Sequence, residues 1–64
     1  MTYGTRIKQA RETRRLTQEQ LAEQLDISRQ AVSKWENGTS EPSTANLMAL
    51  AKLYNVSVDE LLAG

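Results

Sequence analysis

Residues 16–38 read LTQEQLAEQLDISRQAVSKWENG, and this stretch decides how the chain folds. Thr17 stands three residues before Gln20, which is the spacing of a capping box, in which each side chain bonds the backbone N–H of the other residue. Leu16 and Leu21 occupy the two positions of a hydrophobic staple around the same point. The sequence therefore predicts a helix that begins directly after Thr17.

A second helix follows after a very short connection. Ser28 is a favourable residue for a helix N-cap, and apolar residues recur after it at helical spacing. The pair Asn37-Gly38 marks the end of this helix, because Gly and Asn are common just past a helix C-terminus. We predict helices at Gln18–Leu25 and Arg29–Asn37.

The connection between these two helices is Asp26-Ile27-Ser28. Because a link this short does not allow an antiparallel pair, the helices must cross at a steep angle. Ala22 is the small residue at which they can approach closely. The result is a helix-turn-helix arrangement at about residues 18–37, whose second helix projects from the domain and can enter a major groove.

The rest of the chain is also predicted to be helical, with further helices at Tyr3–Thr13, Thr44–Leu53 and Val58–Leu62. No segment alternates apolar and polar residues as a strand does. The fold class is therefore all-α, a compact five-helix bundle that forms a single domain over residues 1–64. The apolar residues expected in its core are Ile7, Ala10, Leu16, Leu21, Ala22, Leu25, Ile27, Val32, Trp35, Leu47, Leu50, Ala51, Val56, Val58 and Leu61.

The composition excludes several classes of function. The 64 residues contain no cysteine and no histidine, which removes disulfides, thiolate metal sites and the Ser-His or Cys-His arrangements of nucleophilic catalysis. No apolar run approaches the roughly 18 residues of a membrane span, and the polar N-terminus lacks the apolar stretch of a signal peptide. We expect a soluble, non-enzymatic protein with no metal, no cofactor, no membrane contact and no evident small-molecule site.

The charge is balanced in total but not along the chain. Eight basic residues face eight acidic ones, and a net charge of zero weighs against nucleic acid as a partner. Residues 1–38, however, hold seven bases and five acids, whereas residues 39–64 hold one base and three acids. The molecule can therefore have a basic end and an acidic end.

The predicted helix over Arg29–Asn37 has one side that suits the edges of base pairs. At about 100° per residue, Val32 and Trp35 share the inward side. Arg and Lys side chains reach O6 and N7 of guanine, and Gln pairs with N6 and N7 of adenine. The outward side and its flank carry only hydrogen-bonding residues of such types, namely Arg29, Gln30, Ser33, Lys34 and Asn37.

Glu36 is the only acid of this helix and lies off its outward face. There it would not oppose the phosphates of DNA. We predict a salt bridge between Glu36 and Arg11, which would tie the first helix to the third.

At these residues the chain resembles a known family. The runs Leu16-Thr17-Gln18-Glu19-Gln20-Leu21-Ala22 and Ile27-Ser28-Arg29-Gln30-Ala31-Val32-Ser33-Lys34-Trp35-Glu36-Asn37-Gly38 are similar to the lambda-repressor and Cro-like helix-turn-helix proteins, the xenobiotic-response-element group. Residues between Pro42 and Leu62 extend the likeness over nearly the whole chain. The resemblance implies a DNA-binding domain of the Cro/C1 type.

The resemblance also implies roles for individual residues. In this family the glutamine at the start of the second helix contacts phosphate and orients the recognition helix, a role that falls on Gln18. Phosphate also meets the backbone at the end of the recognition helix, around Asn37 and Gly38. The base-reading positions of the family fall on Arg29, Gln30, Ser33 and Lys34.

Two positions depart from the family pattern. Asp26 stands in the turn where Gly is common, and Asp adopts the left-handed conformation only at some cost, so a slightly strained turn is expected. Arg15 stands where Gly often precedes the Leu16-Thr17 pair, which leaves the end of the first helix open.

The leading hypothesis is a sequence-specific double-stranded DNA-binding transcriptional regulator that acts as a repressor in the cytoplasm of a prokaryote, as a cellular or phage protein. Two alternatives remain open: a protein-interaction module of the same fold, such as an adaptor or antitoxin, and the N-terminal piece of a longer regulator. The candidate DNA-contacting residues are Gln18, Ser28, Arg29, Gln30, Ser33, Lys34, Asn37 and Thr39.

A homodimer is expected on a pseudo-palindromic operator, because one monomer reads too few base pairs for useful selectivity. We expect the last helix to provide the contact. Its Leu61 and Leu62, together with Tyr54, are too many apolar side chains for so small a body to bury.

Overall fold

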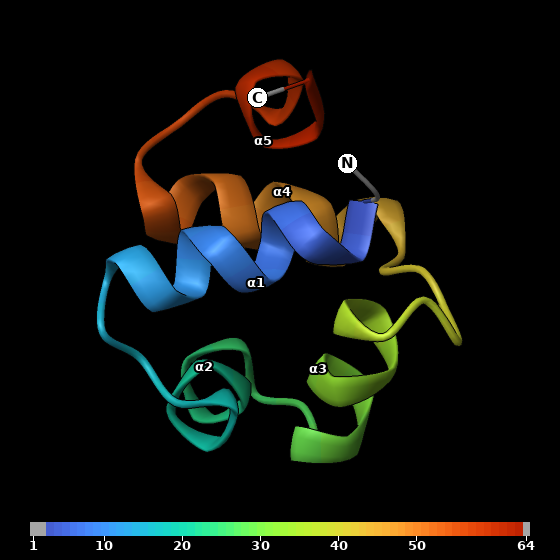
Figure 1. The fold of residues 1–64 in the computed structure, drawn as a ribbon. Coiled ribbons are helices and arrows are strands. Elements are labelled where there is room, and N and C mark those ends of the chain that lie inside the picture. The colour runs from blue at the N-terminus through green and yellow to red at the C-terminus, as the bar shows by residue number, and fades with distance from the viewer. Residues whose placement is uncertain (1–2, 64) are drawn as a thin grey trace.

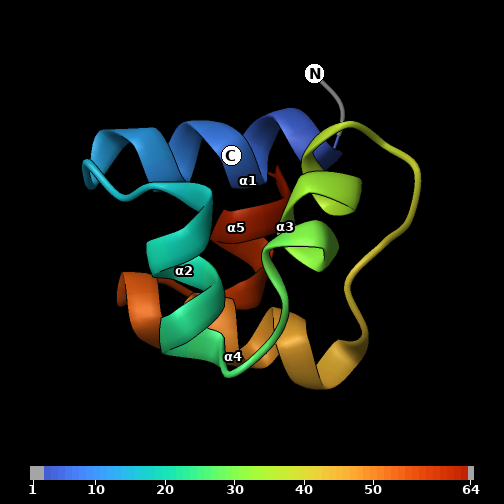
Figure 2. The same ribbon diagram turned by 90° about the horizontal axis from the view of Figure 1, so that it is seen from below.

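A computed structural model of the chain describes residues 3–63, which fold into five helices and contain no strand (Figure 1). The helices are α1 (Tyr3–Thr13), α2 (Gln18–Leu25), α3 (Arg29–Glu36), α4 (Thr44–Tyr54) and α5 (Val58–Ala63). The pair α2 and α3 lies between α1 and α4 at one end of the molecule, and α5 packs against α1 and α4 at the other end (Figures 1 and 2). The predicted all-α five-helix fold is confirmed.

Three of the observed helix ends differ by one residue from the approximate bounds predicted for them. α3 ends at Glu36, because Asn37 has left the helical conformation at φ −92° and ψ 1°. α4 continues to Tyr54, because the chain leaves the helix only at Asn55, which is left-handed. α5 extends to Ala63, one residue further than predicted. None of the helices in residues 3–63 is long and apolar enough to cross a membrane.

Three connections between helices share one construction. Each contains, near its start, a residue in the left-handed conformation at φ 57°, namely Arg15, Asp26 or Asn55. The apolar residue that follows donates its N–H to a carbonyl five residues earlier, as Leu16 does to Arg11 at 3.2 Å. These are Schellman motifs, which normally carry glycine at the left-handed position. The left-handed conformation expected at Asp26 is therefore confirmed, and Arg15 adopts the same conformation after α1.

The helix starts carry the predicted caps. The hydroxyl of Thr17 accepts the N–H of Gln20 at 3.0 Å, and Oε1 of Gln20 accepts the N–H of Thr17 at 2.9 Å, which completes the capping box. The hydroxyl of Ser28 accepts the N–H of Ala31 at 3.2 Å. Each such cap contributes about 1 kcal/mol to the helix that it starts, so the entry points of α2 and α3 are set locally.

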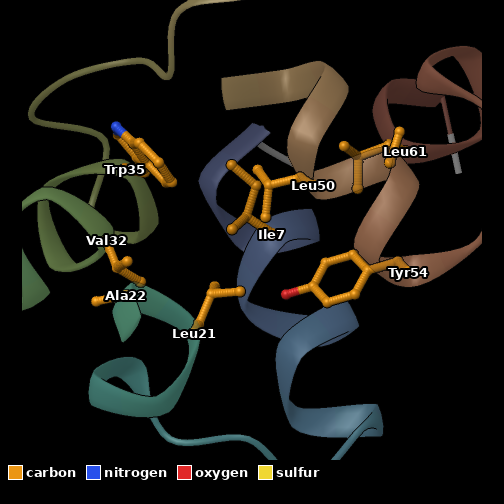
Figure 3. Close-up of a cluster of buried hydrophobic side chains, with 9 residues drawn as sticks. Ile7, Leu21, Ala22, Val32, Trp35, Leu50, Tyr54 and Leu61 are labelled. Carbon is orange, nitrogen blue, oxygen red and sulfur yellow. The ribbon is translucent and has the colours of Figure 1, made fainter. Parts of the chain in front are cut away.

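One core holds the five helices together (Figure 3). The predicted core residues are all either buried or packed against the buried cluster. Val32 and Trp35 are 0% and 5% exposed, so the inward side predicted for α3 is confirmed. The largest exposed apolar side chains among the described residues are Met48 and Leu53, both on α4.

Two of the three side chains that were expected to be too many for this small body to bury, Tyr54, Leu61 and Leu62, are in fact buried. Tyr54 is 3% exposed and Leu61 6%, and only Leu62 is half-buried. The tyrosine ring fills space beside α1, with its hydroxyl directed inward on the side of Leu21 and Ile7 (Figure 3). A small body can therefore bury both side chains, because α5 folds back over α1 and α4.

The buried Tyr54 hydroxyl has no hydrogen-bond partner among the described residues. Burial raises the pKa of Tyr54 to about 12, although the nearby Arg14 acts in the opposite direction. Because the folded pKa lies above the unfolded value near 10, Tyr54 favours the folded state fully below about pH 10 and loses this effect between about pH 10 and pH 12.

We predict that the domain loses about 1 kcal/mol of stability at about pH 11 through Tyr54 alone. Urea denaturation of the wild type and of Tyr54→Phe, at neutral pH and at pH 11, measures this loss as the difference between the two proteins. Other groups titrate in both and cancel. An equal alkaline loss in the two proteins would show that Tyr54 ionises as freely in the folded state as in the unfolded chain.

Candidate nucleic-acid interface

The residues predicted to read bases lie on the outer side of α3, as the helical periodicity requires. Arg29, Gln30 and Lys34 are exposed, and Ser33 is half-buried. In the part of the chain that the structure describes, no hydrogen bond or ion pair involves the side chains of Arg29, Gln30 and Lys34. Their donors and acceptors are thus available to a partner outside the domain.

A buried polar network fixes α3 against α1 and α2. Arg11 donates from Nε to Glu36 Oε2 at 2.7 Å and from Nη2 to Glu36 Oε1 at 3.0 Å, which confirms the predicted salt bridge. Gln18 Nε2 donates to Glu36 Oε1 at 3.0 Å. The Arg11 and Glu36 side chains are only 10% and 4% exposed, so solvent screens this pair little.

The network extends into the connection that leads to α2. Arg11 Nη1 donates to the carbonyl oxygen of Leu16 at 2.7 Å. The hydrogen bond to Glu36 raises the pKa of Arg11, against the opposing effect of its burial, so the guanidinium stays charged. One arginine therefore connects α1, the connection after it and the end of α3 by directional, charge-assisted bonds.

Gln18 stands at the start of α2, half-buried beside α3. Its amide hydrogen bond to Glu36 fits the orienting role that the family resemblance implies for this residue. The link between Gln18 and Glu36 was missed in the sequence, because it depends on how the start of α2 meets the end of α3. Contact between Gln18 and a phosphate stays a prediction.

The far end of α3 forms a compact exposed turn. Asn37 Oδ1 accepts the backbone N–H of Thr39 at 3.0 Å and also its hydroxyl. Gly38 between them has φ +82°, a conformation that favours glycine. Asn37 and Thr39 are thus held together directly after the C-terminal end of α3. Ser28 lies at the opposite end of this helix, with its hydroxyl engaged as the cap.

The structure therefore brings the candidate residues onto α3 and its two ends, with Gln18 joined to them through Glu36. Among residues 3–63, no cluster of three or more acidic side chains is arranged to hold a metal ion.

Two helices joined by a three-residue turn, with a polar outer face on the second, define a helix-turn-helix protein. The corresponding family profile, described as helix-turn-helix, matches residues 7–61. The chain belongs to this family.

Curated relatives match along nearly the whole chain. The transcriptional activator BcrR of Enterococcus faecalis is 47% identical over 64 residues, which are 100% of this chain and 31% of BcrR. The transcriptional regulator DicA of Escherichia coli is 44% identical over 64 residues, 100% of this chain and 47% of DicA. The chain spans about a third to a half of the length of these relatives.

A solved structure shares the fold. The c2 repressor of phage P22, in complex with a synthetic operator, matches with a TM-score of 0.90 and 36% sequence identity. The match covers 100% of this chain and 97% of that one. The fold is thus that of the lambda-repressor-like domains.

Proposed function

We propose that this chain, residues 1–64, is a single DNA-binding domain of a transcriptional regulator, and that it represses by occupying its operator. The observation that carries the proposal is the outer face of α3. There Arg29, Gln30 and Lys34 are exposed and have no side-chain partner among residues 3–63, while Val32 and Trp35 are buried. α3 would enter the major groove as one rigid piece, because Glu36 and the core hold it.

The comparisons support the same proposal. The relatives of this chain include the c2 repressor of phage P22, the immunity repressor of phage phi105 and other transcriptional regulators. The relatives are longer than this chain, which favours a DNA-binding piece of a longer regulator. The proposal places the protein on DNA in the cytoplasm of a prokaryotic cell and gives it no enzymatic activity.

The residues divide into two groups by what they would contact. Arg29, Gln30, Ser33 and Lys34 would read base edges, and residues at the two ends of α3 and the start of α2 would contact the backbone. The backbone group consists of Gln18, Ser28, Asn37 and Thr39.

Retention on duplex DNA at increasing salt concentration tests the function. A DNA-binding domain shows a steep linear fall of log affinity with log salt, since each phosphate contact releases counterions. A protein-interaction module of the same fold, which is the alternative hypothesis, would show no such dependence of affinity on salt. Selection from random duplexes would then give the operator, its symmetry and its half-site spacing.

Activation is a second candidate outcome of operator binding, since the 47% identical relative BcrR is named an activator. A reporter gene behind the selected operator separates the two. Repression lowers its expression in proportion to occupancy, and activation raises it.

We predict that Arg29→Ala weakens binding to the selected operator by about 1–3 kcal/mol and relaxes preference at one base pair. Gln18→Ala should weaken all duplexes alike, because phosphate contacts carry no sequence information directly. Binding selections with the two variants measure both effects. A selected site identical to that of the wild type would remove Arg29 from the base-reading group.

We further propose that two copies bind a pseudo-palindromic operator and associate through α5. Tyr54 and Leu61 are committed to the core, so Leu62, which is half-buried, remains as the apolar contribution of this helix. The contact is then small, and association is expected mainly on DNA. Sedimentation of the protein with operator DNA tests this: one copy per two half-sites would exclude the dimer.

A further inference from the structure

A hollow of about 190 Å³ lies between α1 and α5. Its lining is mixed. Apolar side chains come from Tyr54, Val56 and Leu61, charged ones from Arg6 and Arg14 of α1 and Glu60 of α5, and Gln9, Ala10 and Thr13 complete it. None of its lining residues belongs to α2 or α3, and α5 lies at the opposite end of the molecule from these two helices (Figure 1). This hollow is therefore separate from the candidate nucleic-acid interface.

The guanidinium of Arg14 is held in place at this hollow. Its Nη1 donates to the carbonyl of Ala10 at 3.0 Å and its Nη2 to the carbonyl of Tyr54 at 2.8 Å. Its carbon Cζ lies 4.3 Å from the centre of the Tyr54 ring. A guanidinium has five N–H donors, so three remain for a ligand. Because the group is already positioned, a ligand would bind without ordering this side chain.

The charges around the hollow favour an anion. Two guanidinium groups line it against one carboxylate, and Oε1 of Glu60 accepts the N–H of Ser57 at 3.2 Å. The lining therefore has a net charge of +1, which one carboxylate of a ligand neutralises, whereas an uncharged molecule would leave the arginines without an anion. The apolar side chains of the lining favour a compact hydrocarbon body next to that charge.

We propose that the hollow between α1 and α5 binds a small organic carboxylate with one negative charge and a compact apolar body, such as an aromatic acid. The carboxylate would accept hydrogen bonds from Arg14 and Arg6, in the geometry that guanidinium groups favour. The volume is adequate, since a protein cavity of about 150 Å³ is known to hold benzene.

The first test is a titration of the protein with benzoate, in which the backbone amide chemical shifts are measured by NMR. The expected result is saturable shifts concentrated at α5, at Val56 and at the part of α1 that lines the hollow. Phenol supplies the apolar body without the charge, and acetate the charge without the body. Both should bind at least about tenfold more weakly, since each lacks one of the two recognition elements.

Three variants locate the site on the folded domain. Arg6→Gln should weaken benzoate binding about tenfold. Glu60→Gln should tighten it about threefold, because it removes a negative charge while a glutamine can still form the capping bond with Ser57. Lys8→Gln is the matched control: it removes an exposed positive charge from α1 outside the hollow and should change nothing.

Thermal denaturation first establishes that each variant is folded. The proposal is overturned if benzoate produces no saturable shifts, or if its shifts follow basic side chains over the whole surface. Equal effects of Arg6→Gln and Lys8→Gln would also overturn it, because they would show general attraction of an anion instead of a site.

Discussion

Glu36→Ala is expected to destabilise the domain by about 3 kcal/mol or more, because it leaves the guanidinium of Arg11 buried and without its anion. Arg11 is 8% exposed, and two of its hydrogen bonds go to Glu36. The substitution also leaves the Gln18 amide without its acceptor. A domain of 64 residues has a total stability of only about 3–10 kcal/mol, so the variant should be largely unfolded at moderate temperature. Urea denaturation measures the loss.

The double variant Arg11→Met with Glu36→Leu distinguishes this explanation from a general intolerance of the site. It replaces both charges by apolar side chains and should be more stable than Glu36→Ala, since no buried charge is left uncompensated. Glu12→Ala, at an exposed acid of α1, is the control and should lie within about 0.5 kcal/mol of the wild type. A loss below 1 kcal/mol in Glu36→Ala would show that water replaces the carboxylate at little cost.

The helix-turn-helix segment could be predicted in detail because its determinants are local. The capping box of Thr17 and Gln20 and the cap at Ser28 each act within three residues along the chain. The left-handed conformation of Asp26 follows from the short turn that must hold it. Such features need no knowledge of the rest of the fold, and the structure confirms them.

Burial at the other end of the molecule could not be predicted in the same way. Tyrosine is amphipathic and occurs both in cores and on surfaces, so the sequence alone does not decide where Tyr54 lies. Its burial depends on the position at which α5 returns over α1 and α4. The same tertiary arrangement creates the hollow beside Arg14, which no local pattern indicates.

The residues of the candidate interface could be predicted from the sequence, but only some of the hydrogen bonds that hold them in place could be. Helical periodicity placed Val32 and Trp35 inside and Lys34 outside, and charge complementarity suggested the Arg11–Glu36 pair. That the same carboxylate also accepts a hydrogen bond from the amide at the start of α2 required the structure. A carboxylate can accept several hydrogen bonds, so the predicted pair of Glu36 with Arg11 left room for a further donor to Glu36.

Gly4→Ala is expected to destabilise the domain by about 1–3 kcal/mol, although alanine is the better helix former by about 1 kcal/mol. Gly4 is buried where the start of α1 meets the end of α3. A Cβ at this position would collide with the carbonyl oxygen of Trp35 and would lie 2.7 Å from that of Glu36. Both are backbone atoms, so relief requires that α1 and α3 move apart.

Two other substitutions separate this collision from ordinary effects of alanine. At Gly38 a Cβ would meet nothing within 4 Å. Gly38→Ala should therefore lower the stability of the domain by only about 1 kcal/mol, which is the cost of holding an alanine in the left-handed conformation. Lys8→Ala lies on the exposed side of α1 and should be nearly neutral. Urea denaturation measures the stability of the three variants. The folded fraction of Gly4→Ala should also bind the operator more weakly, because the displaced end of α3 carries Lys34. A Gly4→Ala domain as stable as the wild type would mean that the start of α1 can move away from the end of α3 at little cost.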